Sequence, residues 1–482
     1  MPELSQSSET GTCRWWQPAF FAALAGGMAW GIRGQYGHET GAMIAGVLVS
    51  LTLTYLLCPR VSSITLARAV AWGTLAMGIG GTMTYGQTVG LTHDTPLVGN
   101  VDAYRWGMLG LAIKGGIWIG FAGAFLGMGW SSVRYRATEI LLLMLALLGA
   151  HFLGVYLLNS PFDPDNQILP TLYFSDAWHW EPEGGFEPRF EQWGGLLLAL
   201  ATLIAYTGWY RKDRLACNMA LWGVLGGAVG FPIGQTVQAY FAWNREAMAG
   251  SWWSGLGMNW WNTMETVYGT VMGAVLGIGA WVNRSLIKPV EVESEVSMPL
   301  EMEVVLLMIH LPMLIAVEFL VLAPVDALYD LGLVMVLIPM VAVTGGRWWP
   351  FLQVLPLTMI PIAGKTIRSV GHNSEPLATI PYWLWYVIVP IGIALMMAIR
   401  YGKQSKLQPN GIPFVRWSLL LTTLVYFLLN DAFFGHHWPW TDDRWPSTNG
   451  KIFTAFALGL TVLVLLPARF TRDSDSGASG SN

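Results

Sequence analysis

Long apolar stretches separated by short polar ones dominate the chain. Segments such as Ile140–Leu158 ("ILLLMLALLGAHFLGVYLL") and Val304–Ala323 run for about 20 residues with almost no charge. A helix of that length, rising 1.5 Å per residue, crosses about 30 Å of hydrocarbon. The pattern therefore predicts membrane-spanning helices.

Apolar segments of this kind recur along the whole sequence. They predict an all-α fold, a polytopic integral membrane bundle of about 14 transmembrane helices. The expected spans are 18–36, 41–58, 64–88, 106–130, 138–158, 193–210, 215–241, 258–282, 303–323, 330–345, 350–364, 379–399, 414–430 and 451–468. The first, tenth and eleventh are short or interrupted, so the range expected is about 12 to 14.

Hydropathy and charge also divide the chain into regions. The expected regions are a cytoplasmic segment (1–16), a repeat-containing transmembrane half (17–288), an acidic cytoplasmic linker (289–302), a second transmembrane half (303–468) and a disordered cytoplasmic tail (469–482). The first region is polar, and no small-residue cleavage motif of a signal peptide follows the first apolar run. The tail "TRDSDSGASGSN" is of low complexity, which is typical of disorder.

Composition supports the same class and excludes others. The chain is 54% hydrophobic and 12% charged, whereas soluble domains have about 25% charged residues. The net charge of −4 argues against a nucleic-acid partner. The expected partners are the lipid bilayer and a small polar solute, and the oligomeric state stays open. No Walker loop, GxSxG or HExxH motif occurs, so no cofactor or metal is expected.

The distribution of cations predicts the orientation. Alternate loops, starting with the N-terminus, hold about two thirds of the 26 lysines and arginines, and such loops face the cytoplasm. Cys13, Cys58 and Cys217 fall on the same side, where thiols stay reduced. We expect a protein of the plasma (inner) membrane with both termini in the cytoplasm.

Two parts of the first half resemble each other. The segments 65–134 and 215–284 share Trp, GQTV, a GAxLGxG pattern and Arg in that order, and a fainter partial copy covers 19–58. Repeats of helix pairs that run the same way through the membrane are related by an axis along the membrane normal. We expect such an internal parallel repeat. Close helix packing is the simpler explanation of the GAxLGxG part.

Polar residues gather beside glycines at one set of helix ends. The motif "RGQYGHETGAM" follows the first apolar run, and six of the eight histidines lie on that predicted outer side. The expected substrate-binding residues are Arg33, Gln35, His38, Glu39, Gln87, Gln235 and Gln238. Glycine lets a helix unwind there and line a cavity. The alternatives are solvated loops and glutamines that only bond neighbouring helices.

Three charged residues lie inside predicted spans. Lys114, Glu265 and Glu318 each cost at least about 2.5 kcal/mol at the bilayer centre unless they are paired or wetted. Lys114 and Glu265 occupy similar positions in the two repeat copies, so we expect them to pair or to couple an ion. Glu318 is a further candidate for ion coupling or for a buried pair, although its place near a helix end would also let it reach outward. A buried pair that only fixes helix register is the structural alternative.

These features favour a secondary transporter for a polar solute, with a site open to the extracytoplasmic side. Tryptophan clusters such as "DAWHW" and "HHWPWTDDRW" would suit stacking on a carbohydrate, although they also anchor proteins at membrane interfaces. The alternative is an integral-membrane enzyme, for example a transferase with a lipid-linked donor. Its acid and base residues would be His38, Glu39, His93, Asp94, His436, His437 and Asp442. A scaffold without chemistry is the third interpretation.

Overall fold

The structure is a computed structural model of the 482-residue chain. It describes residues 13–37, 39–82, 84–175, 177–185, 187–291, 296–329, 332–372, 379–405, 410–434 and 448–466. Helices make up most of these ranges, and no β-strand occurs in them. The all-helical expectation is therefore confirmed for the described part of the chain.

The helices follow the predicted spans closely. The main ones are α1 (Trp16–Arg33), α2 (Glu39–Leu57), α3 (Ser63–Ile79), α4 (Gly86–His93), α5 (Val101–Trp130), α6 (Ala137–Leu158), α7 (Trp193–Ala205), α8 (Arg214–Trp243), α9 (Arg245–Met248), α10 (Trp260–Val282), α11 (Leu300–Glu318), α12 (Ala323–Tyr329), α13 (Gly332–Gly345), α14 (Trp349–Val354), α15 (Pro356–His372), α16 (Thr379–Trp383), α17 (Val389–Gln404), α18 (Ile412–Phe433) and α19 (Thr448–Leu465). π-helical turns extend α7 to Tyr210 and join α16 to α17. Short 3₁₀ turns occupy several of the connections.

Fewer helices than expected are long and apolar enough to cross a membrane. Within the described residues there are 11, or up to 12 if α12 and α13, which are bent by 74°, form one broken span. The expected count of 14 also included α1 and α3. α1 is diluted by glycine and by polar end residues, and α3 ends after 17 residues. These two helices lie inside the bundle, where protein rather than lipid surrounds them.

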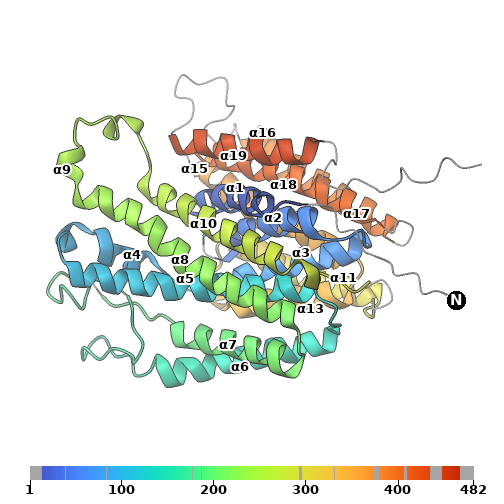
Figure 1. Ribbon diagram of the computed structural model, residues 1–482, viewed down its shortest axis with the longest axis horizontal. Helices are drawn as coiled ribbons and strands as arrows, with labels where there is room; N and C mark the ends of the chain where they lie inside the picture. Colours follow the sequence, from blue (N-terminus) through green and yellow to red (C-terminus); the bar gives the residue numbers. More distant parts are fainter. Residues whose placement is uncertain are drawn as a thin grey trace, which may run out of the picture.

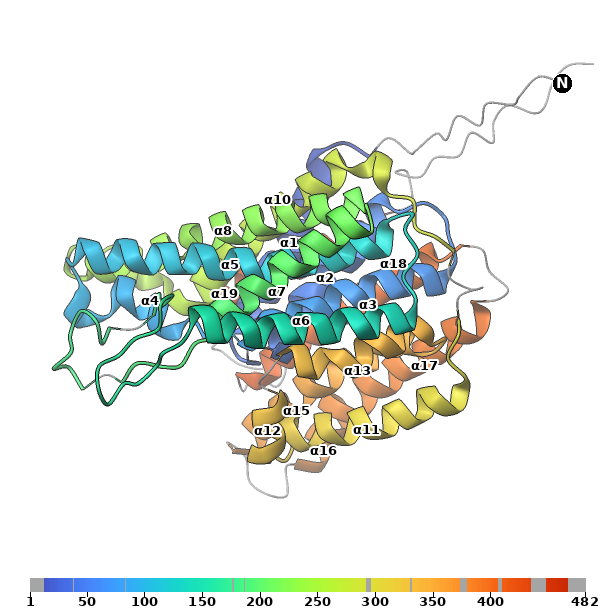
Figure 2. The same cartoon turned by 90° about the horizontal axis from the view of Figure 1, so that it is seen from below.

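Six helices of the first half form a closed ring. α1 packs against α2, α2 against α3, α3 against α5, α5 against α8, α8 against α10, and α10 against α1. We call the end where α1 finishes, α4 lies and α10 begins the α4 end; it is on the left of Figure 2, with the N-terminus on the right. Aromatic rings, including Trp30, Trp118 and Tyr268, fill the interior of the ring.

Glycines bring two pairs of helices in the ring into backbone contact. A Cβ on Gly227 of α8 would lie 1.8 Å from the carbonyl oxygen of Gly115 on α5, and one on Gly269 of α10 would lie 2.1 Å from that of Gly26 on α1. The first glycines of the two GAxLGxG patterns, Gly123 and Gly273, meet neighbouring backbone in the same way. Small residues therefore serve close packing here, as in many membrane helix pairs.

The remaining long helices contact this ring mainly at α1, α2, α3 and α5 (Figure 1). α6 and α7 pack together, and α7 also contacts α5. α13 and α14 contact α3, while α18 contacts α2 and α19 contacts α1. The outer helices expose apolar side chains such as Leu142 and Phe152 of α6 and Met308 of α11. Uncovered apolar faces of this kind fit contact with lipid.

The third expected span, 64–88, is broken. α3 ends at Ile79, a 3₁₀ turn covers Gly80–Thr82, and α4 starts a separate short helix at Gly86. The indole nitrogen of Trp118 donates to the carbonyl oxygen of Met77 at 2.7 Å, in place of a further helical hydrogen bond. A Cβ on Gly80 would lie 2.3 Å from the same indole. Glycine therefore makes room for the tryptophan that ends the helix. We call Thr84 and Tyr85, which directly precede α4, the α3–α4 break.

Candidate functional site

The turn between α1 and α2 carries the motif RGQYGHE. Arg33, the last residue of α1, is 2% exposed, and its Nη1 lies 2.8 Å from Oε1 of Glu265 on α10. The hydroxyl of Tyr85, in the α3–α4 break, contacts both members of this pair. The indole nitrogen of Trp261 also donates to Glu265, at 3.2 Å. The first ion pair therefore joins α1, α10 and the break.

Aromatic rings enclose the guanidinium of Arg33. Its Cζ lies 4.9 Å from the ring centroid of Tyr85, 5.2 Å from that of Trp30 and 5.5 Å from that of Trp118. The negative faces of aromatic rings attract cations, and this attraction is stronger where water is excluded. The cage therefore helps to hold a charged group away from water, in addition to Glu265.

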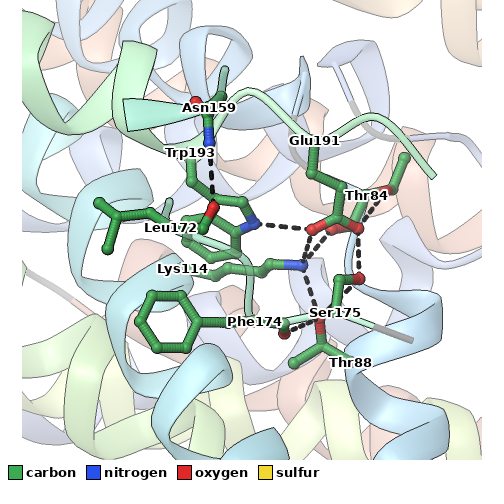
Figure 3. Close-up of polar contacts among 9 residues, drawn as sticks. All are labelled: Thr84, Thr88, Lys114, Asn159, Leu172, Phe174, Ser175, Glu191 and Trp193. Atoms are coloured by element: carbon green, nitrogen blue, oxygen red, sulfur yellow. Dashed lines mark hydrogen bonds and ion pairs between the residues drawn. The ribbon is translucent and has the colours of Figure 1, made fainter. Parts of the chain in front are cut away.

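A second buried ion pair also contacts the α3–α4 break (Figure 3). Nζ of Lys114, on α5, lies 2.6 Å from Oε2 of Glu191 and donates to the carbonyl oxygen of Thr84 and to the hydroxyl of Thr88, both at 2.6 Å. Glu191 also accepts from Trp193 at 2.7 Å. Lys114 is fully buried, and these bonds give it a complete set of three acceptors.

The third buried pair holds the turn between α1 and α2. Nζ of Lys365, on α15, lies 3.0 Å from Glu318, the last residue of α11, and donates to the carbonyl oxygen of Tyr36 at 2.6 Å. Thr40 donates to Glu318 at 2.8 Å. Gly37 adopts a φ of +83°, and a Cβ there would lie 2.7 Å from Nζ of Lys365. The turn is therefore shaped around the lysine.

The three ion pairs have one structural feature in common. Each cation contacts a non-helical segment near the α4 end: the turn of residues 34–37 for Lys365, and the α3–α4 break for Arg33 and Lys114. Irregular backbone at membrane depth is tolerated where it is buried in protein or lines a cavity. Two such segments lie next to three buried charge pairs, and this arrangement defines the candidate site.

The glutamines expected to share a ligand have different partners. Gln235 of α8 is buried and donates to Thr92 of α4 at 2.6 Å, and Gln238 lies 3.4 Å from His93. Gln87 donates to the carbonyl oxygen of Glu187 in the loop after α6. Gln35 is half-buried in the turn of residues 34–37. The structure therefore brings Gln235 and Gln238 to α4, where they join helices together.

One expected pairing of charged residues is wrong. Lys114 and Glu265 do not pair with each other: Lys114 pairs with Glu191 at 2.6 Å, and Glu265 pairs with Arg33 at 2.8 Å. Glu318, a candidate for ion coupling or a buried pair, is 2% exposed and lies 3.0 Å from Lys365. Its carboxylate also accepts a hydrogen bond from Thr40, in the first turn of α2.

Sequence reasoning missed three residues of this site. Glu191 was one of several acidic residues in a loop, with nothing to distinguish it. Lys365 was assigned to a loop because the expected span stopped at 364, whereas α15 continues to His372. Tyr85 stands between two glycine clusters, "GIGG" and "GQ". That flanking is the one local signal that could have identified it.

The residues considered for an enzyme are only partly described. His38, His436, His437 and Asp442 lie outside the described residues. Glu39 begins α2 and packs against Gly81. His93 lies 3.8 Å from Asp94 at the end of α4, and its ring is 6.5 Å from that of Trp261. The described members of that set thus lie beside the candidate site.

The fold and these pairs define a class. In the described part of the chain the protein is all-helical, has 11 helices of membrane-spanning length and apolarity, as expected of a membrane-embedded protein, and contains buried charge pairs. No protein-family model matches the chain, and no curated protein matches it in sequence. The function is therefore argued from the site.

Proposed function

We propose that this protein is a secondary transporter for a polar solute, with its site at an extracytoplasmic α4 end and both termini in the cytoplasm of a plasma (inner) membrane. One observation carries the proposal: the α3–α4 break contacts two buried ion pairs at once, through Tyr85 and Thr84. Interrupted helices beside buried charges are how many transporters bind solutes and coupling ions.

Glu265 is the coupling residue in this proposal. Its carboxylate is fully buried and is neutralised by Arg33. A proton or another cation that reaches Glu265 would weaken its attraction for Arg33 and would release Tyr85 and the break. An ion can shift a conformational equilibrium only if it binds one of the two conformations more tightly than the other. Breaking the Arg33–Glu265 pair would provide this difference in affinity.

The expected repeat gains support from the ring. The helix pairs α1/α2, α3/α5 and α8/α10 correspond to the partial copy 19–58 and the copies 65–134 and 215–284. The second helix of each pair packs against the first helix of the next, and α10 closes the ring on α1. We infer that the three pairs are related by a rotation about an axis along the membrane normal.

A carbohydrate is the first solute class to test. Tyr85 and Trp261 stack at 6.0 Å with their planes 20° apart, close to Glu265 and His93. Aromatic faces next to hydrogen-bonding groups suit the apolar and polar sides of a sugar ring. This cluster also belongs to the described part of the α4 end, unlike the tryptophans of the 435–447 segment.

Uptake by proteoliposomes tests the proposal. Purified protein would be offered a panel of radiolabelled mono- and disaccharides, polyols and amino acids, with and without a proton gradient. We expect accumulation of one class and a loss of about tenfold or more in initial rate for Glu265→Gln, because the coupling charge is removed. Glu246→Gln, which changes an exposed carboxylate on α9, should transport normally. Uptake of every compound at the level of protein-free vesicles would overturn the proposal.

A paired substitution separates transport from folding. Glu265→Leu alone removes the carboxylate that lies 2.8 Å from the buried Arg33. Breaking a buried ion pair in this way typically costs about 3–5 kcal/mol, whereas replacing both members with apolar residues is often neutral. We expect Arg33→Met/Glu265→Leu to recover the thermal stability of the wild type and to remain inactive in uptake. Full uptake by the stable double variant would reduce this pair to a structural role.

Normal uptake by Gln87→Ala and Gln235→Ala proteins would remove the glutamines from the site.

A further inference from the structure

A cavity lies at the end of the bundle opposite the α4 end. Its volume is about 700 Å³, and it opens where α5 leads into α6 and α7 leads into α8. Arg134, Arg136 and Arg211 line it, together with the carboxylate of Glu139. The volume is in the range of small-ligand pockets, about 300–1,000 Å³. Among the described lining residues, three guanidinium groups thus stand beside one carboxylate.

Glu139 organises this cavity from the first turn of α6. Its Oε1 lies 2.9 Å from Nε of Arg211 and accepts from the hydroxyl of Tyr206. Arg211 also donates to the carbonyl oxygen of Arg134, and its Cζ lies 5.1 Å from the ring centroid of Tyr135. Arg211 is thus held in one orientation by several contacts. A pre-positioned guanidinium suits a phosphate because it offers a planar pair of donors.

The surface beside the cavity is apolar and aromatic. Trp209 is 84% exposed and Tyr210 is 75% exposed, at the end of the helix that leads into Arg211. α6 starts at the cavity and exposes Leu141, Leu142 and Leu145. Exposed Trp and Tyr next to an apolar helix face are typical of the level of lipid headgroups. The basic cavity therefore opens where acyl chains and headgroups meet.

We propose that this cavity binds the phosphate headgroup of an anionic phospholipid, with the acyl chains lying along the exposed face of α6. Basic pockets between transmembrane helices recognise anionic lipids in this way, and the cytoplasmic leaflet is rich in them. Arg134 and Arg136 supply charge at the mouth, since both are exposed, and Arg211 supplies oriented donors. The site is separate from the transport site at the α4 end and does not depend on it.

Native mass spectrometry in detergent tests the proposal. The full chain would be titrated with phosphatidylglycerol or with phosphatidylcholine of the same acyl chains. We expect a retained phosphatidylglycerol adduct and little phosphatidylcholine. Each arginine removed should weaken the adduct about fivefold, so that Arg134→Ala/Arg136→Ala loses about twenty-five-fold. The matched control is Arg400→Ala/Lys403→Ala, which removes two exposed cations of α17 outside the cavity, and should bind as the wild type does.

Two further measurements make the outcome decisive. Arg134→Lys/Arg136→Lys keeps the charge, so it should retain most of the binding even if the alanine variant unfolds. Inorganic phosphate at 10 mM (about 100-fold above the lipid) should not displace the lipid, because it lacks the acyl chains. Equal loss in the α17 control, equal retention of phosphatidylcholine, or displacement by free phosphate would each overturn the assignment to a lipid.

Discussion

Gly37 shows how one residue can define a buried ion pair. It has a φ of +83°, a conformation that glycine adopts without strain. It also leaves room for Nζ of Lys365, which bonds the carbonyl oxygen of Tyr36 next to it. The positive φ and the space for a neighbouring side chain are separate requirements. Gly99 has a similar φ of +92°, but a Cβ there would have no neighbour within 4 Å.

At the residue scale we predict that Gly37→Ala destabilises the protein more than Gly99→Ala. The alanine at 99 meets only the backbone penalty, about 1 kcal/mol. The alanine at 37 also displaces Lys365 from its carbonyl acceptor and should cost about 2–3 kcal/mol in total. Thermal unfolding in detergent would show a larger fall in Tm for Gly37→Ala. Equal falls would mean that Lys365 does not depend on this turn.

Helix pairs in the ring depend on the absence of side chains at their crossing points. α5 and α8 meet through Gly115 and Gly227, and α1 and α10 meet through Gly26 and Gly269. Close backbone approach allows van der Waals contact along the helices, which is the main attraction between helices in lipid. Gly149 of α6 is different, since a Cβ there would meet nothing within 4 Å.

At the element scale we predict opposite effects for two Gly→Ala substitutions. Gly227→Ala places a methyl group 1.8 Å from a carbonyl oxygen of α5, so the helices must separate, at a cost of about 3 kcal/mol. Gly149→Ala fills open space and removes backbone freedom, which should leave stability unchanged or raise it by up to about 1 kcal/mol. Thermal unfolding of both variants in the same detergent measures the contrast. A stable Gly227→Ala protein would contradict the α5–α8 contact.

At the scale of the whole molecule, the proposed orientation can be measured directly. Glu183 lies exposed in the loop after α6, and Ser132 lies exposed between α5 and α6. In a background without Cys13, Cys58 and Cys217, a membrane-impermeant maleimide should label Glu183→Cys in intact cells and Ser132→Cys only after permeabilisation. The reverse pattern would place the candidate site in the cytoplasm and the lipid-binding cavity outside.

The helices were predictable because they depend on local properties. An apolar run of about 20 residues has to satisfy its backbone groups internally, and a helix does this within the segment. A helix therefore occurs at every expected span. The break after α3 was not predicted, because it depends on Trp118 from another helix. Glycine in "GIGG" permitted the break without requiring it.

The same distinction applies to the charged residues. The sequence by itself determined that Lys114, Glu265 and Glu318 need partners, because an isolated charge is costly in an apolar interior. Only the tertiary structure decided that the partners are Glu191, Arg33 and Lys365. That a charged residue needs a partner follows from its own chemistry and from its place in an apolar segment. The identity of the partner depends on which helices and loops pack together. The long-range contacts that determine this packing cannot be recognised in the local sequence.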